Sequence, residues 1–190
     1  AGSLEKSDQE GIEYSQLILN QSYYHLKAGF CFQARKLSPL CIDIQEKLIP
    51  DSLLFIQSQL WNNLFILRNG SSKESVPKIK ALLEKSRSIV GHSWIQIDLL
   101  LNLGVCYSNF EFVNDLGEVL AELTAIKENC SFNPLNTLRV EILNLYKKLV
   151  LGDVHYCKQS IGMCLQNMKD LVGETAEYAT LLGWDAGLNL

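Results

Sequence analysis

The sequence has 190 residues, of which 47% are hydrophobic and 20% charged, and that balance excludes a disordered tail. No apolar run is long enough to cross a bilayer, so we expect no membrane insertion. The formal net charge of −4 disfavours nucleic acid as the main partner, because a chain that neutralises a phosphate backbone is normally basic.

The N-terminal segment, residues 1–11, begins Ala1-Gly2-Ser3 and is mostly polar, so we expect it to be disordered or a remnant of cloning. A single helical domain is predicted over 12–190, because stretches with the apolar spacing of helices alternate with glycine, proline and capping residues. Its parts are four helical hairpins and a last helix: 12–50, 51–91, 92–132, 133–171 and 173–190.

One proline interrupts this pattern. Pro39 falls inside the second helix of the first hairpin, where it removes a backbone donor and is expected to break or kink the helix. Alternatively, Ser38 caps a new helix that starts at Pro39.

A period of about 41 residues relates the four hairpins. Gly29 and Gly70 stand one such period apart, Gly152 lies two periods beyond Gly70, and Glu111 occupies the position between them. Apolar residues recur at fixed distances before and after each of these turns, with the spacing of one helix face. Such a period is typical of stacked helical repeats, so we predict an all-α solenoid of antiparallel hairpins with about nine helices. The alternative is an ordinary helical bundle whose helices have similar lengths.

The last predicted helix carries apolar residues to its end, including Leu181, Trp184 and Leu188. A terminal repeat needs a polar outer face to stay soluble. We therefore expect further repeats, or a partner, to cover this helix.

The six cysteines indicate a reducing compartment. They form no C-x-x-C pair, and four of them fall on predicted helix faces, where a thiol acts as a small hydrophobic side chain. We therefore expect a cytoplasmic or nuclear protein.

The sequence contains no catalytic constellation. Its three histidines, His25, His92 and His155, fall in different hairpins or turns, and none is paired with cysteines at zinc spacing. No cysteine has a histidine placed to activate it, and the glycines follow helices singly instead of forming a phosphate-binding loop. We expect no enzyme activity, no metal, no cofactor and no small-molecule substrate.

One motif resembles a known repeat family. Leu103-Gly104-Val105-Cys106-Tyr107 resembles the Leu-Gly-x-x-Tyr core of tetratricopeptide repeats, and residues 26–30 and 151–153 look like the family's turn between helices. The chain departs from the family in its period, which is longer than the family's period of about 34 residues, and only the third hairpin carries the glycine–tyrosine pair. The resemblance implies a right-handed α-solenoid whose concave face is lined by the first helix of each hairpin.

On that face the resemblance suggests six polar or aromatic residues for partner binding. They are Tyr23, Trp61, Asn62, Asn102, Arg139 and Tyr146. Amides can bind an extended backbone, an arginine can bind a carboxylate, and aromatic rings supply buried area. Changing Trp61 or Arg139 is expected to weaken partner binding without loss of helix. For Tyr23 and Tyr146 the alternative is that they simply pack between helices.

We therefore expect a non-catalytic protein–protein interaction module. It would act as a scaffold subunit of a larger hetero-complex or as a domain that docks a peptide. The alternative is a regulatory or substrate-docking arm of an enzyme whose catalytic domain lies outside this sequence.

Overall fold

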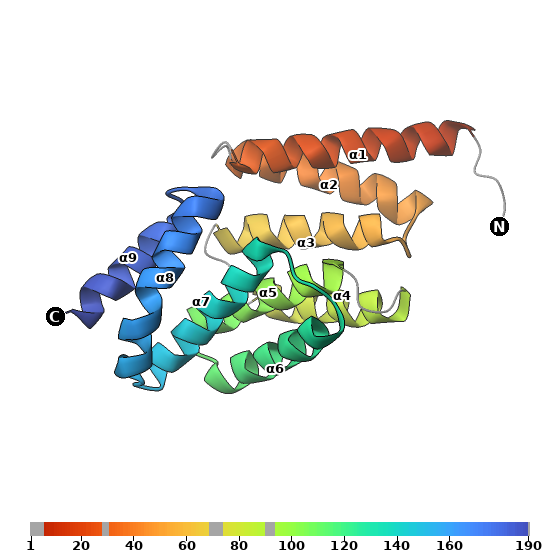
Figure 1. Cartoon of the computed structure of the whole chain (residues 1–190). Helices are drawn as coiled ribbons and strands as arrows, with labels where there is room; N and C mark the ends of the chain where they lie inside the picture. The colour runs from red at the N-terminus through yellow and green to blue at the C-terminus, as the bar shows by residue number, and fades with distance from the viewer. Residues whose placement is uncertain (1–5, 28–30, 69–73, 90–93, 190) are drawn as a thin grey trace. The chain divides into compact units, whose positions relative to one another are not determined.

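The computed structural model describes residues 6–27, 31–68, 74–89 and 94–189 of the chain. Within these residues it contains nine α-helices and no strand, which confirms the predicted all-α class (Figure 1). The helices are α1 (Lys6–Lys27), α2 (Cys31–Leu48), α3 (Leu53–Arg68), α4 (Ser75–Ile89), α5 (Trp94–Asn109), α6 (Val113–Asn129), α7 (Pro134–Val150), α8 (Val154–Val172) and α9 (Ala176–Leu188).

The chain divides into two compact units, an N-terminal unit (Ala1–Leu99) and a C-terminal unit (Leu100–Leu190), with the boundary inside α5. In the N-terminal unit α1 packs on α2, α2 on α3, and α3 on α4. In the C-terminal unit α6 packs on α7, α7 on α8, and α8 on α9. Packing between helices that follow each other in the chain is the arrangement expected of stacked antiparallel hairpins. The single domain over 12–190 stays a prediction.

Helix α1 begins at Lys6, inside the segment for which we expected disorder. Asp8 lies in its first turn, where the helix dipole favours a carboxylate. Gln9 donates a hydrogen bond of 3.1 Å to Glu13, one turn further on. These local interactions extend the first helix through residues 6–11, while residues 1–5 lie outside the described part of the chain.

Helix α2 continues through Pro39, so the expected break does not occur and no new helix starts there. Ser38 does not act as a cap: its hydroxyl is buried and donates to Asn62 Oδ1 on α3 at 2.7 Å. Proline costs about 3 kcal/mol or more inside a helix. Here α2 packs against both α1 and α3, and that packing outweighs the local cost.

Two of the four turns can be compared directly, and they match when one is placed on the other at a shift of one period. Phe112 N–H donates to Tyr107 O at 3.0 Å, and Asp153 N–H donates to Lys148 O at 2.9 Å. Between each pair lies a residue with positive φ, Glu111 at 58° and Gly152 at 78°. The turn without a glycine therefore adopts the same helix-ending conformation as the turn with one. The turns at Gly29 and Gly70 lie outside the described residues.

The glycine of the Leu-Gly-x-x-Tyr motif lies in a close contact between α5 and α7. A Cβ atom at Gly104 would lie 2.6 Å from Leu143 Cδ1 on α7. Leu103, Cys106 and Tyr107 of the same motif are buried. The motif therefore lets α5 approach α7 closely.

The interiors of the two units differ in chemistry. In the C-terminal unit a continuous apolar cluster joins α7, α8 and α9, and it consists of Leu138, Leu145, Cys157, Ile161, Cys164, Met168, Leu181 and Leu188. In the N-terminal unit polar side chains are buried between the helices. They are Ser15, Ser22, Ser38, Gln45, Ser58, Asn63, Ser75, Ser86 and Gln96. Among the described residues, every buried polar or charged side chain belongs to the N-terminal unit.

Candidate interaction surface

The six residues predicted to bind a partner all lie on first helices of hairpins and are all partly buried. Tyr23 on α1 and Trp61 and Asn62 on α3 belong to the N-terminal unit. Three further residues belong to the C-terminal unit, and they are Asn102 on α5 and Arg139 and Tyr146 on α7. The structure brings Tyr23 and Trp61 into direct contact.

That contact is part of the packing between helices. The rings of Tyr23 and Trp61 meet edge to face, with centroids 4.9 Å apart and an interplanar angle of 79°. Trp61 also packs against the buried cluster formed by Ile18, Leu19 and Cys41. Aromatic pairs of this geometry add roughly 0.5–1.5 kcal/mol beyond their buried area. Replacing Trp61 therefore disturbs the interior of the N-terminal unit as well as any surface that it offers.

Tyr146 occupies a comparable position in the C-terminal unit. Its ring lies 5.5 Å from that of Trp184 on α9, and both side chains are partly buried. Burial raises the pKa of the Tyr146 hydroxyl, and the nearby carboxylate of Glu111 raises it further. Tyr146 thus links α7 to α9 through aromatic packing.

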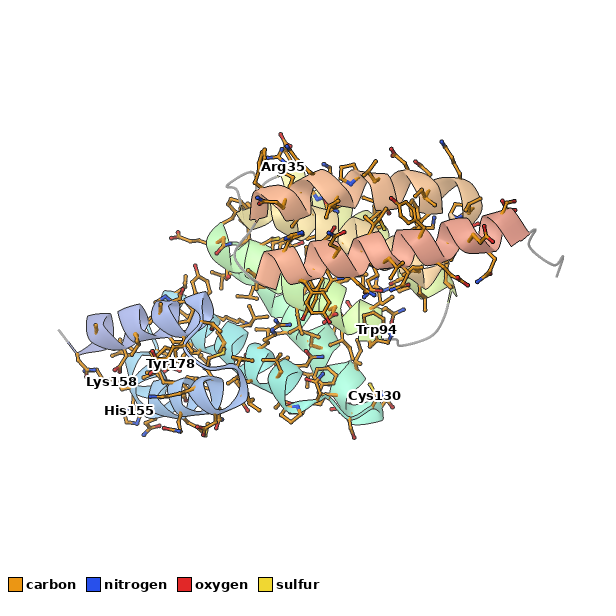
Figure 2. All side chains as sticks on the ribbon, turned by 90° about the horizontal axis from the view of Figure 1, so that it is seen from above. Arg35, Trp94, Cys130, His155, Lys158 and Tyr178 are labelled. Carbon is orange, nitrogen blue, oxygen red and sulfur yellow. The ribbon has the colours of Figure 1, made fainter. Side chains whose placement is uncertain are left out.

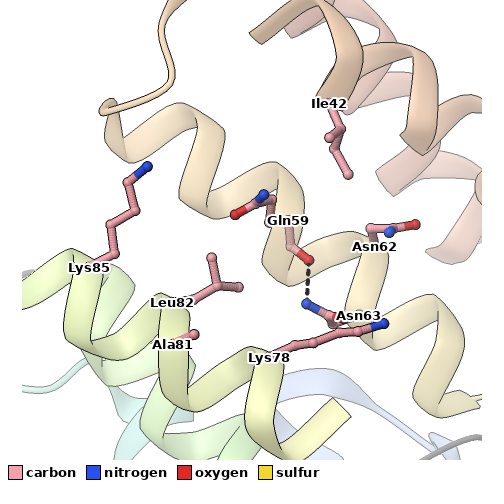
Figure 3. Close-up of a pocket in the computed structure, with 8 residues that line it drawn as sticks. All are labelled: Ile42, Gln59, Asn62, Asn63, Lys78, Ala81, Leu82 and Lys85. Atoms are coloured by element: carbon pink, nitrogen blue, oxygen red, sulfur yellow. Dashed lines mark hydrogen bonds between the residues drawn. The ribbon is translucent and has the colours of Figure 1, made fainter. Parts of the chain in front are cut away.

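A groove lies in the N-terminal unit, where residues of α2, α3 and α4 enclose a volume of about 390 Å³ (Figure 3). Ile42 comes from α2, three amides come from α3, and the remaining residues come from α4. The lining residues are Ile42, Gln59, Asn62, Asn63, Lys78, Ala81, Leu82 and Lys85. A groove of this size, apolar with a few polar groups, is within the range of ligand-binding sites.

Two of the groove's amides are held in place by hydrogen bonds. Ser38 donates to Asn62 Oδ1 at 2.7 Å, so the Nδ2 of Asn62 is the atom left to contact a ligand. Asn63 is 5% exposed, and its Nδ2 donates to Gln59 O at 3.0 Å. These bonds fix the amide orientations before any ligand arrives, which lowers the entropy cost of binding.

The two lysines of the groove differ in how firmly they are held. Lys85 Nζ donates to Pro50 O, lies 3.2 Å from Asp51 Oδ1, and sits 5.3 Å from the centre of the Phe55 ring. It is therefore anchored where α3 begins. Lys78 is exposed on α4 and lines the same groove (Figure 3).

The sequence did not indicate this groove. Asn62 was predicted to line the first-helix face, and no role was predicted for Lys78 or Lys85. The usable signal was the spacing of Lys78 and Lys85, which are seven residues apart and therefore share one side of α4. The groove also requires Ile42 of a different hairpin, and residue spacing within one helix does not specify that neighbour.

Metal-binding groups are not gathered in the described part of the chain. No group of three or more His, Cys, Asp or Glu side chains there could hold a metal ion. His155 lies on the exposed side of α8, with its Nε2 2.9 Å from Gln159 Nε2; Figure 2 shows it with Lys158 on the same helix. No described helix is both long enough and apolar enough to cross a membrane.

Neither a protein-family model nor a curated protein matches this sequence. Two solved structures match its fold, both from Podospora anserina and both described as a putative kinesin light chain with nearly identical TPR-like repeats. The first has a TM-score of 0.64 at 14% identity and covers 94% of this chain and 96% of its own. The second, a single-substitution variant, has a TM-score of 0.64 at 14% identity and covers 98% and 97%. The chain therefore has a TPR-like helical repeat fold.

Proposed function

We propose that this TPR-like chain is a non-catalytic protein–protein interaction module, which serves as a scaffold subunit of a larger assembly or docks a peptide. The observation that carries the proposal is the repeat itself, a series of helical hairpins whose two described turns share one geometry. Stacked repeats create extended surfaces along which several side chains can contact one partner. Arg139 is the first-helix residue best suited to bind a carboxylate, because a guanidinium offers two parallel donors.

The cysteines support a reducing compartment, and we place the protein in the cytoplasm or nucleus. Cys41, Cys106, Cys157 and Cys164 are free and buried. Burial raises the pKa of the Cys106 and Cys164 thiols to about 11, so both are neutral near pH 7. A neutral buried thiol is a weak nucleophile and acts as a small hydrophobic side chain.

The test is capture of partners on the immobilised chain under reducing conditions, followed by reconstitution from purified components. We expect a stoichiometric protein partner that binds the purified chain in calorimetry. Arg139→Ala is expected to weaken that binding about tenfold, and Lys158→Ala, which removes a charge from the exposed side of α8, is expected to leave it unchanged.

Equal binding by the Arg139→Ala and Lys158→Ala variants would contradict the proposal that the partner binds the surface formed by the first helices. Failure of every captured protein to bind the purified chain would contradict the interaction module itself. Circular dichroism of each variant verifies that its helices are intact.

A further inference from the structure

The groove of α2, α3 and α4 is built mostly from helices other than those of the predicted first-helix surface. Two of its three helices, α2 and α4, are the second helices of their hairpins. Of the six predicted partner-binding residues, only Asn62 lines it. The groove therefore needs an explanation of its own.

Three of the polar side chains that line the groove, Asn62, Lys78 and Lys85, offer hydrogen-bond donors. The side-chain oxygen of Asn62 already accepts a hydrogen bond from Ser38, so the NH₂ group of Asn62 is left to donate to a ligand. The ammonium groups of Lys78 and Lys85 can only donate. None of the eight lining residues is acidic, although the whole chain has a net charge of −4. Asp51 pairs with Lys85 at one end, but that carboxylate and Pro50 O engage two of the three ammonium protons, and one remains. Such a lining favours a ligand rich in acceptors and negative charge.

The spacing of the two lysines suggests the form of that ligand. Lys78 and Lys85 are seven residues apart on α4, so their backbone positions are separated by about 10 Å along the helix. A peptide in the extended polyproline II conformation rises by about 3.1 Å per residue with three residues per turn, so side chains three residues apart lie on one face and span about 9 Å. Between the two lysines, Ala81 and Leu82 provide an apolar floor with Ile42 across from them.

We propose that this groove is a second docking site, which binds an extended acidic segment of a partner protein. Two carboxylates, three residues apart, contact Lys78 and Lys85. The amide of Asn62 donates to the peptide backbone, and aliphatic parts of the segment lie on Ala81 and Leu82. The site rests on the proposed function only in taking the ligand to be part of a protein.

The test uses fluorescence anisotropy of the whole chain with fluorescein-labelled peptide mixtures of the form Glu-x-x-Glu, Gln-x-x-Gln and Lys-x-x-Lys. We expect the Glu mixture to bind about fivefold more tightly than the Gln mixture, and the Lys mixture to bind least. Raising the salt concentration should reduce the preference, because exposed charges are screened. Lys78→Gln should remove most of the preference for the Glu mixture over the Gln mixture. Lys80→Gln, which makes the same charge change on the same helix outside the groove, should leave it intact.

A steric variant tests the location of the site. Ala81 is exposed at the groove, so Ala81→Trp should fold normally, as circular dichroism can verify, and should prevent binding of every mixture. Equal binding of the Glu and Gln mixtures would overturn the acidic selectivity, and unchanged binding by Ala81→Trp would overturn the location. If no peptide mixture binds while a captured protein does, the groove proposal fails and the proposed function stands. If the Glu mixture binds while no captured protein binds the purified chain, the groove proposal stands and the proposed function fails.

Discussion

The N-terminal and C-terminal units build similar helical hairpins around different interiors. In the N-terminal unit, Gln45 Nε2 donates to Ser15 Oγ at 3.1 Å, and Cys41 Sγ lies 3.3 Å from Ser58 Oγ. In the C-terminal unit, the described interior between α7, α8 and α9 consists of aliphatic and sulfur-containing side chains. A hairpin stack of this period therefore does not require one particular kind of core.

The difference also has an energetic side. Buried hydrogen-bonded groups contribute only about 1 kcal/mol each, whereas buried aliphatic side chains contribute roughly 1.5–3 kcal/mol. Ser22 Oγ, Gln45 Oε1 and Ser75 Oγ are buried without a hydrogen-bond partner among the described residues, and all three belong to the N-terminal unit. We infer that the C-terminal unit is the more stable one, and that the unit with the groove is the more adaptable.

The largest expected effect comes from removing an aliphatic side chain from the C-terminal core. Ile161 is 2% exposed, and Ile161→Ala should lower the free energy of unfolding by about 2–5 kcal/mol in urea titrations. The same change at Ile56, which is fully buried in the N-terminal unit, should cost less, because that unit buries polar side chains to which entering water can bind. A larger loss of unfolding free energy for Ile56→Ala than for Ile161→Ala would contradict the inferred difference between the interiors of the two units.

A smaller effect is expected from filling the close contact between α5 and α7. Gly104→Ala should destabilise the protein by about 1–3 kcal/mol, because the added Cβ meets Leu143. Gly162→Ala on α8 is the matched control: nothing lies within 4 Å of its added Cβ, so it should stabilise the helix by up to about 1 kcal/mol. Thermal unfolding measures both. Similar shifts for the two variants would mean that α5 and α7 are not closely packed in solution.

In the N-terminal unit, removing a polar group is expected to be favourable at one serine and unfavourable at another. Ser22→Ala should raise the free energy of unfolding by about 1 kcal/mol, because it removes a buried hydroxyl that has no partner among the described residues. Ser58→Ala should lower it by about 0.5–1.5 kcal/mol, because Ser58 Oγ donates to Leu54 O at 3.0 Å. Urea titration distinguishes the two signs, and a loss at Ser22 would show that water or a rearrangement satisfies its hydroxyl.

The smallest expected effect is a pH dependence at the turn before α8. Asp153 accepts from Lys148 Nζ at 3.1 Å and from Tyr156 N–H at 3.3 Å, and these bonds hold its pKa below the ordinary value of 3.8. A lowered folded-state pKa stabilises the fold above pH 3.8, and this contribution disappears as the pH falls through the folded-state pKa. The melting temperatures of the native chain and Asp153→Asn should therefore differ near neutral pH and converge in acid. A constant difference would exclude this ionisation as the cause.

The sequence was a good guide to the fold because its strongest signals are local. The helix faces and the Leu103–Tyr107 motif each lie within one hairpin, and the period repeats such a local pattern along the chain. Pro39 does not end α2 as its residue type suggests, because packing against α1 and α3 stabilises the helix. The start of α1 was also missed, since polar residues can form a helix when they cap it or pair along it.

The site was harder to predict because its geometry depends on contacts between hairpins. Ser38 and Asn62, which set the amide of the groove, are 24 residues apart in the chain. Tyr23 and Trp61 could be selected as aromatic residues on first helices, but only the structure reveals that they pack against each other. Which of the six predicted residues contact a partner stays a prediction.

The matching turns at Glu111 and Gly152 have a consequence for how such a chain can change in length. Each supplies the same backbone hydrogen bonds to the helices on either side, whatever its residue type. A gene duplication or deletion of one whole repeat between equivalent points of the two turns would therefore join helix ends that already fit. The protein could gain or lose whole hairpins without inventing a new junction.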